Sequence, residues 1–148
     1  MTKLKYIDGD ILDSEDIFDV IVHGCNCFCN FGAGLAKGVK HIYPEAYKAD
    51  LATLKGDKKK LGSCSYHDYH GFTVINAYTQ YFYGGKKTNA DYNAIRKCMK
   101  WIKNAYSGKR IGLPKIGAGL AKGDWNTIEK IIMEELKGED ITIVNLKK

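Results

Sequence analysis

Two identical glycine-rich heptapeptides carry the groups best suited to holding a charged ligand. Residues 32–38 and residues 117–123 both read Gly-Ala-Gly-Leu-Ala-Lys-Gly, and each copy follows a predicted strand and leads toward a predicted helix. Glycine lets a ligand approach main-chain N–H groups, and a helix N-terminus adds unpaired donors with a partial positive charge. The two turns therefore predict the two halves of one anion cradle, best suited to a pyrophosphate. Coincidental repetition with tight packing is the alternative.

His23 is the nearby side chain best suited to catalysis. It follows the apolar run of residues 18–22, which predicts a buried strand, and open α/β sheets bind ligands at the carboxyl ends of such strands. An imidazole titrates near neutral pH and can act as an acid, a base or a nucleophile. A hydrogen-bonded histidine at a strand end is the alternative. His41, His67 and His70 fall in predicted helix or hairpin segments and are weaker candidates.

The cysteines do not predict a metal site. Five are present, and three of them alternate at Cys25, Cys27 and Cys29. Structural zinc sites usually take a second pair of ligands from elsewhere in the chain, and this sequence offers none. We therefore expect no metal and no cofactor. An odd number of cysteines without an export signal favours reduced thiols.

Size and charge favour one compact domain with a small ligand. The 148 residues are expected to form a single domain over residues 1–148. The net charge is +6, but the lysines are scattered apart from Lys58–Lys60, so a solvated loop is favoured over a nucleic-acid surface. No apolar run approaches the ~20 residues of a membrane span, and residues 1–5 lack a signal-peptide core. We expect a soluble, cytoplasmic monomer that contacts neither membrane nor nucleic acid.

Apolar periodicity predicts strands that alternate with helices. Strands are predicted over residues 4–7, 18–22, 63–66, 72–78, 111–113 and 141–146, with an aromatic loop over residues 81–85. Helices are predicted over residues 34–43 and 44–54, after the cap residue Asp91, and after Asp124 or Asn126. This order predicts a fold of the α/β class, a three-layer α/β/α sandwich with a mixed central sheet.

The ordered set of motifs resembles the macro domain family. Three segments match the family in its own order: Gly9-Asp10-Ile11, Asn26 followed by Gly32-Ala33-Gly34, and Ile116-Gly117-Ala118-Gly119-Leu120. The resemblance covers essentially the whole chain. Residues 21–34 and 114–125 are most similar to the small ADP-ribose-1″-phosphate phosphatases, a branch related to the terminal ADP-ribose protein glycohydrolases. The resemblance implies the macro domain fold and a ligand that carries adenosine, a diphosphate and a distal ribose.

The resemblance also assigns roles to residues. Asp10 would accept a hydrogen bond from the adenine amino group, with Asn145 flanking the adenine, and Asn26 would bind the distal ribose hydroxyls. A turn residue is the alternative for Asp10, and a turn cap for Asn26. Main-chain N–H groups of residues 32–36 and 116–121 would wrap the diphosphate. The implied substrate-binding residues are Gly9, Asp10, Ile11, Gly24, Cys25, Asn26, Phe31, Gly32, Ala33, Gly34, Leu35, Ala36, Lys115, Ile116, Gly117, Ala118, Gly119, Leu120, Ala121 and Asn145.

The implied reaction is removal of the 1″-phosphate from ADP-ribose-1″-phosphate, which yields ADP-ribose and phosphate. A phosphomonoester requires in-line attack and a stabilised leaving oxygen. His23 stands three residues before Asn26, where the 1″-phosphate is expected to lie. The candidate catalytic residues are therefore His23 and Asn26.

Departures from related branches bear on the other reactions. The glycohydrolase branch carries a lysine on the central strand and an aspartate after the second glycine turn, where this chain has Gln80 and Ala121. Another branch carries an aspartate after the first glycine turn, where this chain has Ala36. Covalent attack on protein-linked ADP-ribose is therefore less expected. Release of ADP-ribose from protein or acyl groups and non-catalytic reading of ADP-ribose remain the alternatives, with an ADP-ribosylated protein as a second class of partner.

Overall fold

The computed structural model describes residues 4–146 and builds them around a six-stranded mixed sheet. The strands are β1 (Lys5–Gly9), β2 (Val20–Cys25), β3 (Cys64–Asp68), β4 (Thr73–Tyr78), β5 (Arg110–Leu113) and β6 (Asp140–Leu146), in the order β1-β6-β5-β2-β4-β3. Only β3 runs antiparallel to its neighbour. The predicted mixed sheet is confirmed. Residues 1–3, which entered the expectation about an export signal, lie outside the described residues.

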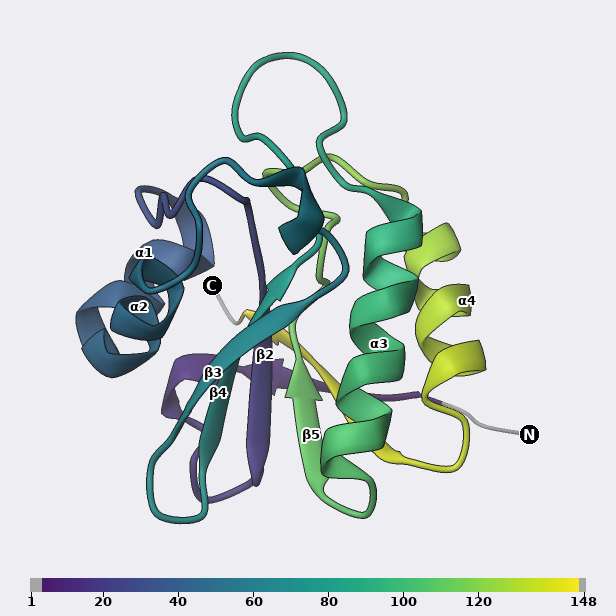
Figure 1. Cartoon of the computed structure of the whole chain (residues 1–148). Helices are drawn as coiled ribbons and strands as arrows, with labels where there is room; N and C mark the ends of the chain where they lie inside the picture. Colours follow the sequence, from purple (N-terminus) through teal and green to yellow (C-terminus); the bar gives the residue numbers. More distant parts are fainter. Residues whose placement is uncertain (1–3, 147–148) are drawn as a thin grey trace.

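Helices cover both faces of the sheet. On one side lie α1 (Gly34–Ile42) and α2 (Pro44–Leu51), and on the other lie α3 (Tyr92–Tyr106) and α4 (Trp125–Glu135) (Figure 1). Two short 3₁₀ helices, η1 (Ile11–Asp13) and η2 (Lys58–Lys60), sit in the connections. The predicted three-layer α/β/α sandwich is confirmed. Within residues 4–146, no helix is both long enough and apolar enough to cross a membrane.

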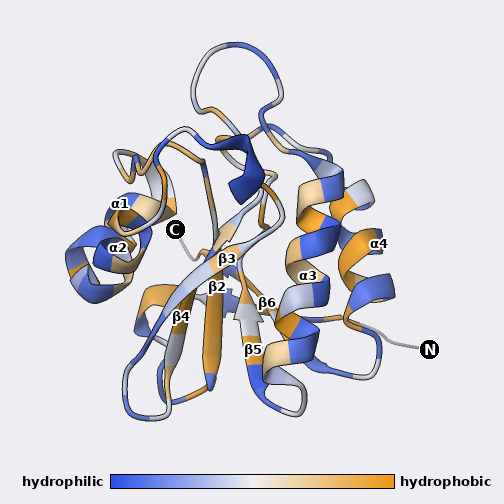
Figure 2. Ribbon diagram, in the orientation of Figure 1, coloured by the Kyte–Doolittle hydropathy of each residue, from blue (hydrophilic) through white to orange (hydrophobic). Residues whose placement is uncertain are grey.

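Each face of the sheet has its own apolar core. Along β2, Val20 and Val22 belong to the core beneath α3 and α4, whereas Ile21 and Cys25 belong to the core beneath α1 and α2. Figure 2 shows the central strands as the most apolar part of the fold, with hydrophilic residues on the outer faces of the helices. A strand that is buried on both faces reads as a continuous apolar run, which explains the sequence of residues 18–22.

The central strand is longer and lies later in the chain than predicted. Its predicted bounds were residues 18–22, whereas β2 spans Val20–Cys25. The polar His23 and the flexible Gly24 interrupt the apolar run, so the pattern indicated a strand end at Val22. The ladder to β4 overrides that local signal, because His23, Gly24 and Cys25 pair with consecutive residues of β4.

The two identical heptapeptides adopt different conformations. In the first copy, Gly34 has a φ of +59° and begins α1 directly. The second copy is an irregular turn that closes when Gly123 N–H donates to the Gly117 carbonyl at 2.7 Å. Its helix, α4, begins only after Asp124, whose carboxylate accepts a hydrogen bond from Thr127 N–H at 3.1 Å. A helix follows each copy, as predicted. Only the first copy contributes residues to the helix that follows it.

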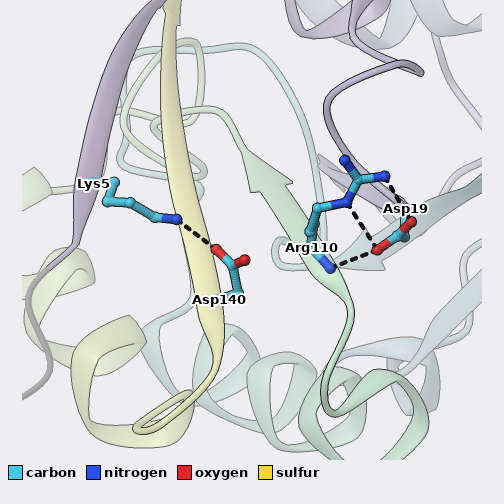
Figure 3. A network of polar contacts seen from close by, with 4 residues as sticks. All are labelled: Lys5, Asp19, Arg110 and Asp140. Atoms are coloured by element: carbon cyan, nitrogen blue, oxygen red, sulfur yellow. Dashed lines mark hydrogen bonds and ion pairs between the residues drawn. The ribbon is translucent and has the colours of Figure 1, made fainter.

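Ion pairs join neighbouring strands at the edge opposite these turns. Lys5 on β1 lies 2.6 Å from Asp140 on β6, and Arg110 on β5 lies 3.0 Å from Asp19 before β2 (Figure 3). The hydrogen bond from Arg110 lowers the pKa of the Asp19 carboxyl. Exposed ion pairs contribute little stability. They link the starts of neighbouring strands.

The seventh positions of the two heptapeptides provide a matched test of this difference. We expect Gly123→Ala to lower the free energy of unfolding by about 1–3 kcal/mol, as overpacking does, because its Cβ would lie 2.6 Å from the Gly117 carbonyl oxygen. Gly38→Ala places a Cβ 2.5 Å from the flexible end of Leu12, and alanine favours a helix by about 1 kcal/mol. It should therefore be nearly neutral. Urea unfolding of both variants measures the difference, and equal losses of stability would contradict it.

Candidate functional site

A groove formed by two adjoining cavities crosses the carboxyl ends of the parallel strands. The Asn26 cavity has a volume of about 540 Å³, and the Asp10 cavity has a volume of about 530 Å³. Four residues line both cavities and form the waist between them: Gly34, Leu35, Pro114 and Lys115. The groove therefore provides one elongated site with a chamber at each end.

The waist exists because β2 and β5 are parallel neighbours. Their following loops leave the sheet at the same edge and carry one heptapeptide each. The two copies touch there: a Cβ added to Gly34 would lie 2.9 Å from Leu120 Cδ1. Only glycine accommodates both this contact and the positive φ of position 34. The two glycine turns therefore face each other at the groove, as the predicted cradle requires.

Unpaired main-chain donors line the Asn26 cavity from both sides. The first turn of α1 contributes Gly34, Leu35 and Ala36, and no side chain caps this helix. First-turn N–H groups have no partner inside their own helix. In the second heptapeptide, the N–H groups of residues 119–121 donate to no other group within residues 4–146. These two sets of donors can bind one anion between them.

The charge of the groove favours anions at its Asn26 end. Among the described residues that line the Asn26 cavity, none is acidic and two are lysines, Lys115 and Lys122. Lys115 stands at the waist, with its Nζ 6.0 Å from the centre of the Trp125 ring. Lys122 Nζ donates to the Gly85 carbonyl at 2.9 Å. A cation at the waist beside free N–H groups suits a diphosphate.

The Asp10 cavity has a different character. Ile11, Val144 and Leu146 give it apolar walls, and Asp10 places a carboxylate at its edge. One carboxylate oxygen accepts a hydrogen bond from Leu12 N–H at 2.9 Å, which caps η1. Asp10 is therefore both a turn residue and part of the cavity wall. An apolar slot with a carboxylate at its edge suits a flat heterocycle that carries an amino group.

Amide side chains shape the wall of the Asn26 cavity. Asn26 Nδ2 donates to the Asn30 carbonyl at 2.9 Å, and Asn26 Oδ1 accepts from Phe28 N–H at 2.9 Å. Asn30 Oδ1 in turn accepts from Gly32 N–H at 2.9 Å. A carboxamide has two N–H donors and two acceptor positions. Asn26 therefore holds its loop in shape and still has one donor and one acceptor position for a ligand.

His23 does not line either cavity. Its side chain is only 3% exposed and lies on the α1–α2 side of the sheet, with the ring of Phe31 across it at 5.2 Å. The sequence pattern predicted that this ring would lie beside the distal ribose. The alternation of β2 instead turns it beneath the cavity floor, which is the correction that the structure makes.

A hydrogen bond fixes the tautomer of His23, and burial keeps its ring neutral. Its Nε2 lies 2.6 Å from Asn76 Oδ1. The Asn76 amide already donates to the Ala46 carbonyl and to Ser65 Oγ, so Oδ1 accepts and Nε2 carries the proton. Burial lowers the pKa of His23 from 6.5 to about 4. The ring is therefore neutral at physiological pH.

Cys25 lies next to His23 and does line the Asn26 cavity. Its Sγ lies 3.6 Å from His23 Nδ1, the nitrogen that is free to accept a hydrogen bond. Burial raises the pKa of the Cys25 thiol well above its usual value, so it is a poor nucleophile. Across the described part of the chain, no three His, Cys, Asp or Glu residues are grouped so that they could hold a metal ion.

Most of the residues expected at the site line the groove. Those that do not are His23, Phe31, Gly32 and Ala118. Phe31 is buried instead, between the rings of His23 and Tyr47. Residues missed by the sequence analysis are Leu12, Asn30, Gln80, Tyr83, Gly84, Gly85, Pro114, Lys122, Val144 and Leu146. The aromatic loop of residues 81–85 was an available signal for Tyr83, Gly84 and Gly85. The lysine that is repeated in both heptapeptides was the available signal for Lys122.

Comparison with known proteins agrees with this fold and groove. The family model described as the macro domain matches residues 22–132. A 17.5 kDa protein from the tk-vs intergenic region of Enterobacteria phage T4 is 38% identical over 151 residues, which cover 96% of each chain. A protein of Candida glabrata named ADP-ribose 1″-phosphate phosphatase is 26% identical over 180 residues, covering 99% of this chain and 100% of that protein.

A solved structure agrees as well. A protein from Bacteroides thetaiotaomicron is 27% identical and superimposes with a TM-score of 0.80 over 97% of this chain and 100% of that chain. A family match across most of the sequence thus adds to three earlier observations. These are the order of the motifs, the mixed sheet and the groove between the two glycine turns. The resemblance inferred from the motifs is confirmed, and the chain belongs to the macro domain family.

Proposed function

We propose that this protein binds ADP-ribose and hydrolyses ADP-ribose-1″-phosphate to ADP-ribose and inorganic phosphate. The observation that carries the proposal is the set of anion-binding groups at one end of the groove: the unpaired N–H groups of residues 34–36 and 119–121 line the Asn26 cavity, and Lys115 lies at the adjoining waist. The phosphatase name of a relative that matches the whole chain supports the choice of substrate.

The chemistry of the groove sets the direction of the ligand. Adenosine fits the Asp10 cavity, where Ile11 and Val144 contact the base and Asp10 accepts from its amino group. The diphosphate then spans the waist at Lys115. The distal ribose enters the Asn26 cavity, whose free amide positions suit its hydroxyls. A 1″-phosphate on that ribose would remain among unpaired N–H groups.

Hydrolysis in this cavity relies on positioning and electrostatics. Phosphoryl transfer has a loose transition state that spreads charge over the phosphoryl oxygens. Main-chain N–H groups and Lys122 stabilise that charge, while Asn26 and Asn30 orient the attacking water. The water oxygen forms a bond to phosphorus as the bond between phosphorus and the anomeric oxygen breaks, and the proton that the water loses is transferred to the anomeric alkoxide. An anomeric hydroxyl is more acidic than an ordinary sugar hydroxyl, which eases its departure.

Two other functions differ in what they require from this cavity. Release of ADP-ribose from proteins is disfavoured because Gln80 and Ala121, which replace the charged residues of the glycohydrolase branch, both line the cavity. Non-catalytic reading of ADP-ribose is the second candidate. It is favoured by one observation: among the described residues that line the Asn26 cavity, there is neither a histidine nor a carboxylate to serve as a general base.

We assign His23 a positioning role. Its neutral ring packs against Phe31 and lies within 3.6 Å of Cys25, so it supports the floor and the loop that carries Asn26. A group buried in this way acts through the residues above it. Of the two candidate catalytic residues, His23 and Asn26, we propose that Asn26 contacts the substrate.

Removing the charge at the waist tests the binding mode. We expect Lys115→Met to weaken ADP-ribose binding about tenfold, or ~1.4 kcal/mol, because methionine cannot make a charge-assisted hydrogen bond to the diphosphate. Isothermal titration calorimetry measures this change. Lys130→Met, at an exposed position on α4, is the matched control and should bind normally. No heat of binding by the unaltered protein at high micromolar ADP-ribose would contradict the proposal.

Release of phosphate from ADP-ribose-1″-phosphate separates the enzyme from the reader. We expect the protein to release phosphate and Asn26→Ala to lose most of this activity. His23→Gln should retain activity within about tenfold, since loss of a true general acid or base costs about 10²–10⁴-fold. A colorimetric phosphate assay supplies the rates. Binding without any phosphate release would identify a reader, and a loss of more than a hundredfold in His23→Gln would restore His23 as a catalytic residue.

The depressed pKa of His23 also predicts a pH dependence of stability. The folded state favours the neutral ring, so its contribution is fully present above pH 6.5 and is lost as the pH falls toward 4. The loss amounts to about 3 kcal/mol when complete. The free energy of unfolding of His23→Gln should fall less over this range than that of the unaltered protein. His41→Gln, at an exposed position on α1, should keep the original pH dependence.

A further inference from the structure

A ridge of aromatic rings in edge-to-face and tilted contact stands beside the Asn26 cavity, which Tyr83 lines. The ring of Phe28 lies 4.9 Å from that of Tyr81 and 5.3 Å from that of Phe82, and the rings of Phe82 and Tyr83 are 4.9 Å apart. Phe82 is 53% exposed and Tyr83 is 38% exposed. These rings hold one another in place while presenting apolar surface to solvent. Clustered exposed aromatic rings next to a binding cavity indicate an interaction surface.

A lysine lies over one ring of this ridge. Lys58 Nζ lies 5.0 Å from the centre of the Tyr81 ring, and the Tyr81 hydroxyl donates to the Gly56 carbonyl at 2.9 Å. These contacts hold η2, which carries Lys58 and Lys59, against the ridge. In Figure 2, η2 is a short blue helix below the loop of residues 80–90, which projects at the top of the view. The carboxylate of Asp57 is engaged as the cap of η2 through Lys59 N–H at 2.9 Å.

The loop that carries Phe82 and Tyr83 adds positive charge a few residues further along the chain. Residues 80–90 contain Lys86 and Lys87, both exposed, and no acidic residue. This loop is joined to the second heptapeptide: Lys122 Nζ donates to the Gly85 carbonyl, and Asn89 N–H donates to the Ala121 carbonyl at 2.8 Å. We call the rings and lysines together the aromatic–lysine surface, made of Phe28, Lys58, Lys59, Tyr81, Phe82, Tyr83, Lys86, Lys87 and Lys122.

We propose that the aromatic–lysine surface binds a single-stranded nucleic acid. Unpaired bases stack on exposed aromatic rings, and lysines near the rings neutralise the phosphates between the bases. A duplex keeps its base faces covered, and a peptide with only acidic side chains has carboxylates for the lysines but no ring to stack on the aromatic residues. The combination of rings and charge therefore favours a single strand. The surface shares Tyr83 and Lys122 with the wall of the Asn26 cavity, but the inference goes beyond the proposed function and does not depend on it.

This inference departs from the expectation drawn from the sequence. The lysines of residues 58–59, 86–87 and 122 are far apart in the chain and looked like ordinary solvated positions. The hairpin of β3 and β4 ends next to η2, and the following loop returns to the second heptapeptide. The fold thereby gathers lysines from three segments around one set of rings.

Fluorescence anisotropy tests the proposal with a labelled single strand of about 12 nucleotides, a length within the range that such surfaces cover. The same strand annealed to its complement, and polyglutamate of equal length, serve as competitors. We expect the single strand to bind more tightly than either. Phe82→Ala, which removes an exposed ring that lines neither cavity, should weaken binding about tenfold.

Charge is tested by a matched pair of double variants. Lys86→Glu with Lys87→Glu should weaken binding and reduce the slope of log affinity against log salt by about 0.7 for each phosphate that is no longer neutralised. Lys100→Glu with Lys130→Glu changes the net charge equally on exposed positions of α3 and α4 and should have little effect.

Several outcomes would overturn the proposal. These are equal binding of duplex or polyglutamate, unchanged binding by Phe82→Ala, an equally large decrease in affinity for the α3–α4 control, and no binding of the strand at all. Calorimetry with ADP-ribose on the same variants separates this result from the groove. Since Phe82, Lys86 and Lys87 do not line it, ADP-ribose affinity should be unchanged whichever way the nucleic-acid result falls.

Discussion

The parallel pairing of β2 with β5, and of β5 with β6, is the constraint on which the rest of the structure depends. It brings the carboxyl ends of these strands to one edge, where the two identical glycine turns leave the sheet. Parallel sheets commonly bind ligands at this edge, because loops there end with unpaired N–H groups. The ion pairs that link neighbouring strands lie at the opposite edge of the sheet, away from these turns. The groove is therefore a consequence of strand order more than of any single side chain.

The sequence was sufficient for the architecture and for much of the groove. Apolar periodicity identified the alternating strands and helices, and the repeated heptapeptide located the two walls of the waist. Identical sequences could not reveal their different conformations, because these depend on neighbours: Gly34 packs beneath Leu120, whereas Gly123 closes against the Gly117 carbonyl. The same limit applied to the lysines around Tyr81, which only the tertiary fold brings together.

The sequence did not predict on which side of the sheet His23 lies, and the reason is physical. A strand buried on both faces gives no sequence signal for which side chains face the site. Asn76 on β4 supplies the missing information, since it draws His23 into a buried chain of hydrogen bonds that continues through Ser65 and Tyr78 to Asp50. Burial raises the pKa of the Asp50 carboxyl at the far end of this chain. None of these residues lines the cavity, whose lining instead has main-chain donors, amides and lysines.

The central claim is that the two glycine turns jointly bind the diphosphate, each through its unpaired N–H groups. A titration of the isotopically labelled protein with ADP-ribose, followed by amide chemical shifts in nuclear magnetic resonance, tests this most directly. The amides of residues 34–36 and of residues 119–121 should shift together along one binding curve, with the same dissociation constant. Shifts confined to one of the two turns, or separate curves for the two, would contradict the claim.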